Sequence, residues 1–205
     1  GSAAVVHGTA VFSGGTLSGG WTVAAGQTLN AASGVNKFLS GAGTVLSNQG
    51  DLNWATTDLL YMQSGASVDN QGLFLASESM AVTYNGGTAT GFANSGTVRA
   101  AAGKTLTFGN ISGLVNNAGV LDAQAGGSIV YASGAVFNAG SQFTGAGSNV
   151  AAGNNSWNGA FQSSNLVLQT GVHSGNGAVL SGAAAFTGGY LEGGWQVAPG
   201  QVLNA

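Results

Sequence analysis

Six carboxylates are the residues of this 205-residue chain best suited to acid–base chemistry. They are Asp51, Asp58, Asp69, Glu78, Asp122 and Glu192. Hydrolysis by paired carboxyl groups needs the two held about 5–10 Å apart. Asp51 and Asp69 could approach each other in a repetitive fold, but they stand at different offsets from the turns beside them. We therefore expect no catalytic residues and interpret the acids as solvated surface charges.

The other residues that could bind metals or act as nucleophiles form no recognisable constellation. His7 and His173 have no acidic residue at the spacing of a metal site or a catalytic triad. The chain has no cysteine, which excludes disulfides and thiolate metal sites. The glycine pairs at 19–20 and 193–194 are followed by tryptophan, unlike the glycine pairs of calcium-binding repeats. We expect no metal site and no cofactor.

The four tryptophans offer the best candidates for stacking on a ligand. Trp21 and Trp195 occupy the same position in two copies of a longer repeat described below, which favours a structural role. Trp157 lies in a polar, loop-like stretch, where an exposed ring could stack on a sugar. The sequence therefore predicts a ligand contact made by Trp157 with Asn155 and Asn158.

The composition narrows the classes of protein and of partner. Only nine residues are charged, about 4% of the chain against roughly 25% in an ordinary domain. Three basic residues and a net charge of −3 cannot neutralise a phosphate backbone, so we expect no nucleic-acid partner. No run of about 18 apolar residues is present, so we expect no membrane insertion of this segment. The 38 glycines interrupt every window of helical length, which favours short strands and turns.

A short repeat sets the order of these strands. Five Asn-x-Gly turns recur at a nearly constant spacing. Apolar residues stand two positions before most of the asparagines and two positions after the first four glycines, which is the pattern of strands flanking a turn. We expect the asparagines to adopt the left-handed conformation at stacked corners and to stack their amides from coil to coil. The structural corner asparagines are Asn48, Asn70, Asn94, Asn117 and Asn138.

A second column, of apolar-x-aromatic pairs, lies between the turns. Its aromatic members are Tyr61, Tyr84, Phe108 and Tyr131. Interior positions of successive coils would stack at roughly 4.8 Å. We expect one such ladder to contain Leu59, Val82, Leu106 and Ile129. The sequence thus predicts an all-β fold, a right-handed parallel β-helix (solenoid) with about three short strands per coil of roughly 23 residues.

A longer repeat sets the domain organisation. Residues 8–31 and 182–205 are identical at 16 of 24 positions without a gap, and their residue numbers differ by 174. We interpret residues 1–2 as a cloning remnant, 3–181 as one β-helical module, and 182–205 as the start of the next tandem module in the same solenoid. This offset lies between seven and eight coils of the predicted length, so coil lengths must vary. The asparagine rhythm stops near residue 145, and we expect a longer loop or irregular corner near 153–157.

These motifs resemble the β-helical repeat regions of large bacterial surface proteins. The resemblance is to filamentous-haemagglutinin-like exoproteins of two-partner secretion and to autotransporter passengers. It covers most of the chain and is carried by Asn-Gln-Gly-Asp-Leu (48–52), Asn-Ser-Gly-Thr-Val (94–98) and Asn-Asn-Ala-Gly-Val-Leu (116–121). It implies a non-catalytic shaft of an extracellular adhesin or surface fibre. The partners it implies are neighbouring repeat modules, an outer-membrane secretion partner, and a host or cell-surface glycan or protein.

Three other functions remain open on the sequence. A carbohydrate-binding β-helix would use the surface around Trp157. A polysaccharide-degrading β-helix would need clustered acids, and here they are scattered. A phage tail-fibre segment would share the fold and usually form trimers.

Overall fold

The computed structural model describes residues 3–205, in which every regular element is a β-strand. No helix occurs within these residues. The strands are β1 (Ala4–Val6), β2 (Thr9–Phe12), β3 (Gly15–Leu17), β4 (Gly20–Val23), β5 (Thr28–Ala31), β6 (Lys37–Ser40), β7 (Val45–Asn48), β8 (Asp51–Trp54), β9 (Leu60–Gln63), β10 (Ser67–Asn70), β11 (Leu73–Ala76), β12 (Met80–Tyr84), β13 (Gly91–Asn94), β14 (Thr97–Ala100), β15 (Thr105–Gly109), β16 (Gly113–Asn116), β17 (Val120–Ala123), β18 (Ser128–Tyr131), β19 (Val136–Phe137), β20 (Gln142–Thr144), β21 (Ser148–Ala151), β22 (Asn155–Leu168), β23 (Val172–Phe186), β24 (Tyr190–Val197) and β25 (Val202–Asn204).

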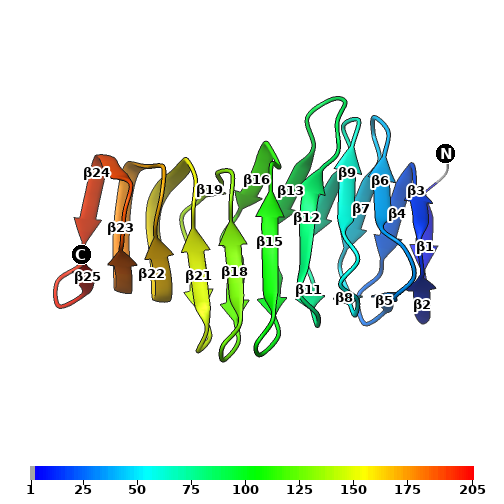
Figure 1. Cartoon of the computed structure of the whole chain (residues 1–205), viewed down its shortest axis with the longest axis horizontal. Coiled ribbons are helices and arrows are strands. Elements are labelled where there is room, and N and C mark those ends of the chain that lie inside the picture. The colour runs from blue at the N-terminus through cyan, green and yellow to red at the C-terminus, as the bar shows by residue number, and fades with distance from the viewer. Residues whose placement is uncertain (1–2) are drawn as a thin grey trace.

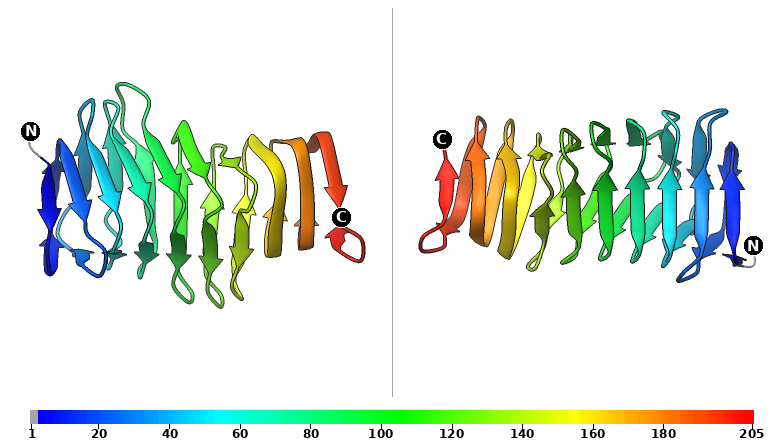
Figure 2. Two further views of the ribbon diagram at one scale, coloured as in Figure 1. Left: turned by 180° about the vertical axis from the view of Figure 1, so that it is seen from behind. Right: turned by 90° about the horizontal axis from the view of Figure 1, so that it is seen from below.

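The strands form three parallel ladders that run the length of an elongated molecule, with the termini at opposite ends (Figures 1 and 2). From β1 to β19, each strand pairs with the strand three places later, so three consecutive strands make one turn, and β20 and β21 also pair with the long strand β22. The first ladder starts with β1, β4 and β7, the second with β2, β5 and β8, and the third with β3, β6 and β9. About nine turns of about 22 residues result. The predicted parallel β-solenoid with three strands per coil is confirmed, and its right-handed winding stays a prediction.

Alternate residues of each strand point into a single core. Strands β10, β11, β13 and β14 all alternate part-buried with buried positions, as the period-two pattern predicts. The residues after the first four turn glycines stack in one buried column, as predicted from their spacing. This column is Leu52, Phe74, Val98 and Leu121. Each fully buried side chain of this size contributes roughly 1.5–3 kcal/mol through the hydrophobic effect.

The register differs from the prediction in the coil that begins near residue 113. Asn94 pairs with Asn116 and not with Asn117, and Phe92 pairs with Leu114, so Val115 faces outward. The turn here is one position longer than the other Asn-x-Gly turns, and Ala118 takes a φ of 58° to accommodate it. A sequence alignment on the glycine therefore places the asparagine one position too late.

The ladder predicted from the apolar-x-aromatic pairs is correct for Leu106 and Ile129, which pair with each other, and wrong in register at Val82. Val82 pairs with Leu60 on one side and Phe108 on the other, in place of Leu59 and Leu106. The coil from β12 to β15 is longer than the coil from β9 to β12, and its extra residues shift the pairing. Of the four aromatic residues of these pairs, Phe108 and Tyr131 lie in the core, whereas Tyr61 and Tyr84 are part-exposed.

Of the two expectations near 153–157, the longer loop does not form, and irregular pairing occurs just beyond it, between Asn158 and Ala160. Residues 155–168 make one continuous strand, β22, which bends around the corners, and β23 does the same (Figure 1). The coils shorten here because their corners are tighter, so that Asn155 already pairs with His173. The break in the asparagine rhythm marks narrower coils.

The long repeat spans eight turns and one further strand. A column of paired residues follows the first ladder from Val6 through eight turns to Gly175. Residue 180 is the equivalent of Val6 in the second copy. It lies on the next ladder round the solenoid, where it pairs with Phe161. The predicted variation in coil length is confirmed, and because the coils at both ends are shorter than those in the middle, the repeat takes in eight turns.

Candidate functional site

A buried ladder of asparagine amides runs through the middle of the core. The Nδ2 of Asn48 donates to the Oδ1 of Asn70, Asn70 donates to Asn94, and Asn94 donates to Asn116, each at 2.7 Å. All four side chains are at most 3% exposed. The ladder ends where Asn116 donates to the carbonyl of Gly119 at 2.9 Å. Among the described residues the Asn48 Oδ1 has no partner, but the other amide groups of the ladder bond to one another or to backbone carbonyls away from solvent, so they are structural and unavailable to a ligand.

The ladder is built differently from the prediction. The asparagines are the last residues of strands β7, β10, β13 and β16, and none has a positive φ, so the expected left-handed corner conformation is wrong. Instead, the glycines after them must lack a Cβ. A Cβ on Gly72 or Gly96 would collide with the carbonyl oxygen of the glycine one coil earlier.

Asn117 and Asn138 belong to a second, outer ladder. Asn138 donates to Asn117 at 2.6 Å, and Asn158 donates to Asn138 at 2.9 Å. Asn117 is exposed and the other two are part-buried. The five predicted corner asparagines therefore divide into a buried group (Asn48, Asn70 and Asn94) and an outer pair (Asn117 and Asn138), which Asn158 extends.

Trp157 is in the core, so the prediction that it is an exposed stacking platform is wrong. It is 0% exposed, and its ring lies 4.4 Å from that of Phe137 and 4.9 Å from that of Phe161, between centroids. It occupies the column position that Asn116 holds two coils earlier. The narrow coils thus replace amides with aromatic rings, which fill the core by packing.

Asn155 and His173 form a buried polar pair beside these rings. Asn155 is 1% exposed. Its Oδ1 accepts from the backbone N–H of Ala135 at 2.9 Å, and its Nδ2 lies 3.3 Å from the His173 Nδ1. His173 is fully buried, and its Nε2 has no hydrogen-bond partner among the described residues. Desolvation lowers the pKa of His173 below its ordinary value, so the ring is neutral at pH 7. Asn155, like Trp157, cannot reach a ligand at the surface.

Each of the three basic side chains lies in an ion pair. The pairs are Lys37–Asp58 at 3.2 Å, Arg99–Asp122 at 2.7 Å and Lys104–Glu78 at 2.6 Å. Asp51 and Asp69 lie on different ladders, in β8 and β10, so the fold does not pair them. These acids therefore neutralise bases or stand apart.

Lys37 is the ion-pair member that lies wholly inside the molecule. Its side chain is 0% exposed, and its Nζ donates to the carbonyl of Val35 at 3.0 Å and to Asp58. The hydrogen bond from the Thr56 hydroxyl lowers the pKa of Asp58 most, and Lys37 lowers it further. The pKa therefore stays below its usual value despite partial desolvation. The prediction that the acids are solvated surface charges is therefore wrong for Asp58, which is paired with a buried lysine. The signal was a lysine where the strand pattern requires an inward side chain.

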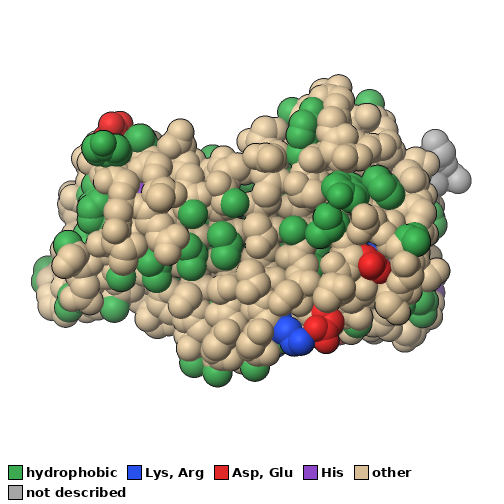
Figure 3. Space-filling model, viewed as in Figure 1, with side chains coloured by type: hydrophobic (Ala, Val, Ile, Leu, Met, Phe, Trp, Pro, Cys, Tyr) green, Lys and Arg blue, Asp and Glu red, His purple; other side chains and the backbone are tan. Residues whose placement is uncertain are grey.

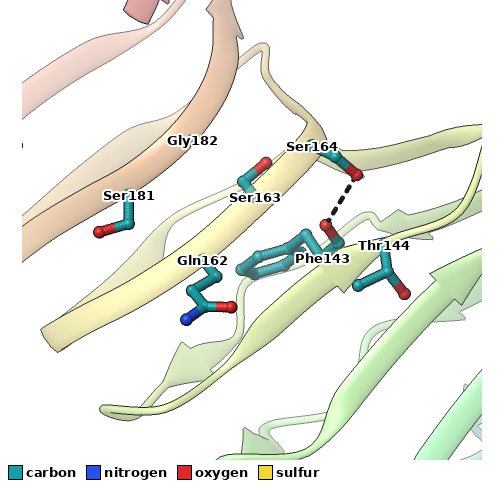
Figure 4. Close-up of a pocket in the computed structure, with 7 residues that line it drawn as sticks. All are labelled: Phe143, Thr144, Gln162, Ser163, Ser164, Ser181 and Gly182. Carbon is teal, nitrogen blue, oxygen red and sulfur yellow. Dashed lines mark hydrogen bonds between the residues drawn. The ribbon is translucent and has the colours of Figure 1, made fainter. Parts of the chain in front are cut away.

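A shallow groove crosses the narrow coils between β20, β22 and β23 (Figure 4). Its walls carry hydroxyl and amide groups, and the Ser164 Oγ donates to the Phe143 carbonyl at 3.3 Å. The groove is lined by Phe143, Thr144, Gln162, Ser163, Ser164, Ser181 and Gly182. None of these side chains is a carboxylate or a base, so the groove can form hydrogen bonds with a polar ligand but supplies no acid–base pair.

The face of the molecule shown in Figure 3 is largely uncharged. In residues 3–205, no three histidine, cysteine or acidic side chains gather closely enough to hold a metal ion. The same residues form no helix with the length and hydropathy needed to cross a membrane.

No protein-family model, curated protein or solved structure matches this chain. What can be stated of it therefore rests on the β-solenoid itself.

Proposed function

We propose that the chain is a non-catalytic structural segment, or shaft, of an extracellular bacterial adhesin or surface fibre. The observation that carries this proposal is the unbroken stack of parallel ladders from β1 to β25. Each coil is hydrogen-bonded to the next through backbone and, in the middle coils, through amide side chains. Such a stack resists bending and sets a reach proportional to the number of coils. The sparse charges support the same function, because three of the six acids are paired with bases and the described residues hold no cluster of three acids.

Antibody labelling of cells that produce the protein tests this proposal. Antibodies raised against the folded chain should label intact cells, and mild external proteolysis should remove the signal. An abundant cytoplasmic protein, probed in parallel, should be labelled only after permeabilisation. Labelling of the chain that likewise requires permeabilisation would contradict a surface location.

A carbohydrate-binding module is the second candidate, now centred on the groove that contains Gln162. The hydroxyl and amide groups that line it favour a polyhydroxylated ligand over a charged one. A glycan array probed with the folded chain and with Gln162→Ala tests it. Binding that Gln162→Ala abolishes would support the module, and no binding by a correctly folded chain would favour the shaft alone.

A further inference from the structure

The two copies of the long repeat fold with the same internal register. Thr9 pairs with Thr28 in the first copy, and their equivalents in the second copy, residues 183 and 202, also pair. Ala4 pairs with Trp21, and their equivalents Ala178 and Trp195 pair as well. The first copy is therefore an internal reference for how the second one sits in a stack.

The copies differ in what covers them on the C-terminal side. In the first copy, β4 and β5 are covered by β7 and β8, whereas no later strand of residues 3–205 covers β24 and β25. Val23 is 0% exposed, and its equivalent Val197 is 40% exposed. Leu29 is 5% exposed, and its equivalent Leu203 is only part-buried. The exposed apolar edge at the C-terminal end is a surface that this fold buries when the next coil is present.

We propose that the edge formed by β24 and β25 is the docking surface for one coil with the sequence of residues 32–55, supplied by a following copy of the repeat. This inference rests on the proposed function as a stacked shaft and names the shaft's partner. The groups that hold residues 32–55 on the first copy are repeated in the second.

The backbone and side-chain partners at this junction match residue by residue. In the first copy, the carbonyls of Val23, Gln27 and Ala31 accept N–H groups from the next coil at 2.9–3.0 Å. The same residue types stand at 197, 201 and 205. The Asn53 amide donates to the Asn30 side chain at 3.1 Å, and asparagine recurs at 204. Docking would satisfy these groups and cover Val197 at once.

The junction also fixes an orientation between copies. Ala10 lies on the ladder of β2, whereas its equivalent Ala184 lies on the ladder of β12, β15 and β18. Each copy is therefore rotated about the long axis of the solenoid by one of its three faces relative to the copy before it. Surface features such as the groove at Gln162 would face three directions in turn along three copies.

The test uses the full chain extended after Ala205 by a second copy of residues 32–55. The chain has no cysteine, so a single Val197→Cys substitution reports burial through its rate of alkylation. We expect the extension to slow alkylation at least tenfold, toward the rate of Val23→Cys, whose site the native coil covers. Tyr190→Cys should react equally fast with and without the extension, because its equivalent Thr16 stays exposed beneath β6.

An extension with the same amino acids in scrambled order is the matched control, and it should leave Val197→Cys reactive. Equal alkylation rates with the native and scrambled extensions would overturn the proposed junction. This readout is independent of where the protein is located, so a failure of surface labelling would contradict the shaft function without affecting the junction.

Discussion

At the scale of single residues, the structure separates polar side chains that look equivalent in sequence. Asn94 and Asn138 both begin an Asn-x-Gly turn, yet Asn94 is 2% exposed and Asn138 is part of the outer ladder. Burial decides how much each asparagine contributes to the free energy of unfolding. An amide that loses its partner in the core cannot form a replacement hydrogen bond with water. Lys37 obeys the same rule, since its ammonium depends on Asp58 and one carbonyl.

Asn94→Ala should lower the free energy of unfolding by about 2–3 kcal/mol, because it removes two buried hydrogen bonds and leaves the Asn116 Oδ1 without a donor. Asn138→Ala should cost less than about 1 kcal/mol, since water can replace its bonds. Urea denaturation followed by circular dichroism measures both. Equal losses in the two variants would contradict the distinction between the ladders.

Asp58→Ala should destabilise the chain by about 3 kcal/mol, because it strands the buried Lys37 ammonium. The double variant Lys37→Met/Asp58→Ala should recover most of the loss, since a methionine needs no counter-charge. Thermal and urea unfolding of the two variants gives the comparison. A double variant no more stable than Asp58→Ala would show that the ion pair is not the source of the loss.

At the scale of the strand and the turn, spacing decides which residue can occupy a corner. Gly72 is required because its N–H bonds to the Asn48 carbonyl at 2.8 Å, which holds its backbone against the coil below. A Cβ there would meet the Gly50 oxygen. The corner glycines are thus explained by close approach between coils, in addition to the turns where φ is positive.

Gly72→Ala should therefore cost about 2–3 kcal/mol through overpacking. Gly20→Ala is the control, because the nearest atom to a Cβ at that position would lie 3.5 Å away. We expect Gly20→Ala to be neutral within about 1 kcal/mol in the same unfolding assay. Similar losses in both variants would mean that chain flexibility, and not the contact with Gly50, explains the glycine.

The narrow coils at β22 and β23 should make stability depend on pH. Burial lowers the pKa of His173 in the folded state, so the unfolded chain binds the proton first as the pH falls. The free energy of unfolding should therefore decrease as the pH drops through about 6.5, and level off below the folded-state pKa. His173→Gln should remove this slope, whereas substitution of the exposed His7 should preserve it. An unchanged slope in His173→Gln would contradict the assignment.

The fold and the stacked columns could be predicted from the sequence because the period-two pattern and the turn interval are both local. Prediction failed where coil length changes, as at Asn117 and Leu59, since a change of one or a few residues moves the register without altering the composition. It failed for Trp157 because a polar stretch looks like a loop, although here it forms part of β22. Burial at that position follows from the narrowing of the coil, which local residue types do not reveal.

At the scale of the whole molecule, the proposed shaft grows by adding turns. One long repeat adds eight full turns and one further strand, which is about a third of a turn. At roughly 4.8 Å per coil, this is about 40 Å of added length for each copy. The cross-section should not change, because the new coils repeat the old ones.

Small-angle X-ray scattering of a tandem chain, residues 1–205 followed by a second copy of 32–205, tests the stacked shaft most directly. Compared with the single chain, we expect the maximum dimension to increase by about 40 Å at a constant cross-sectional radius of gyration. A larger cross-section with little gain in length would mean that the copies pack side by side, and would contradict the stacked shaft.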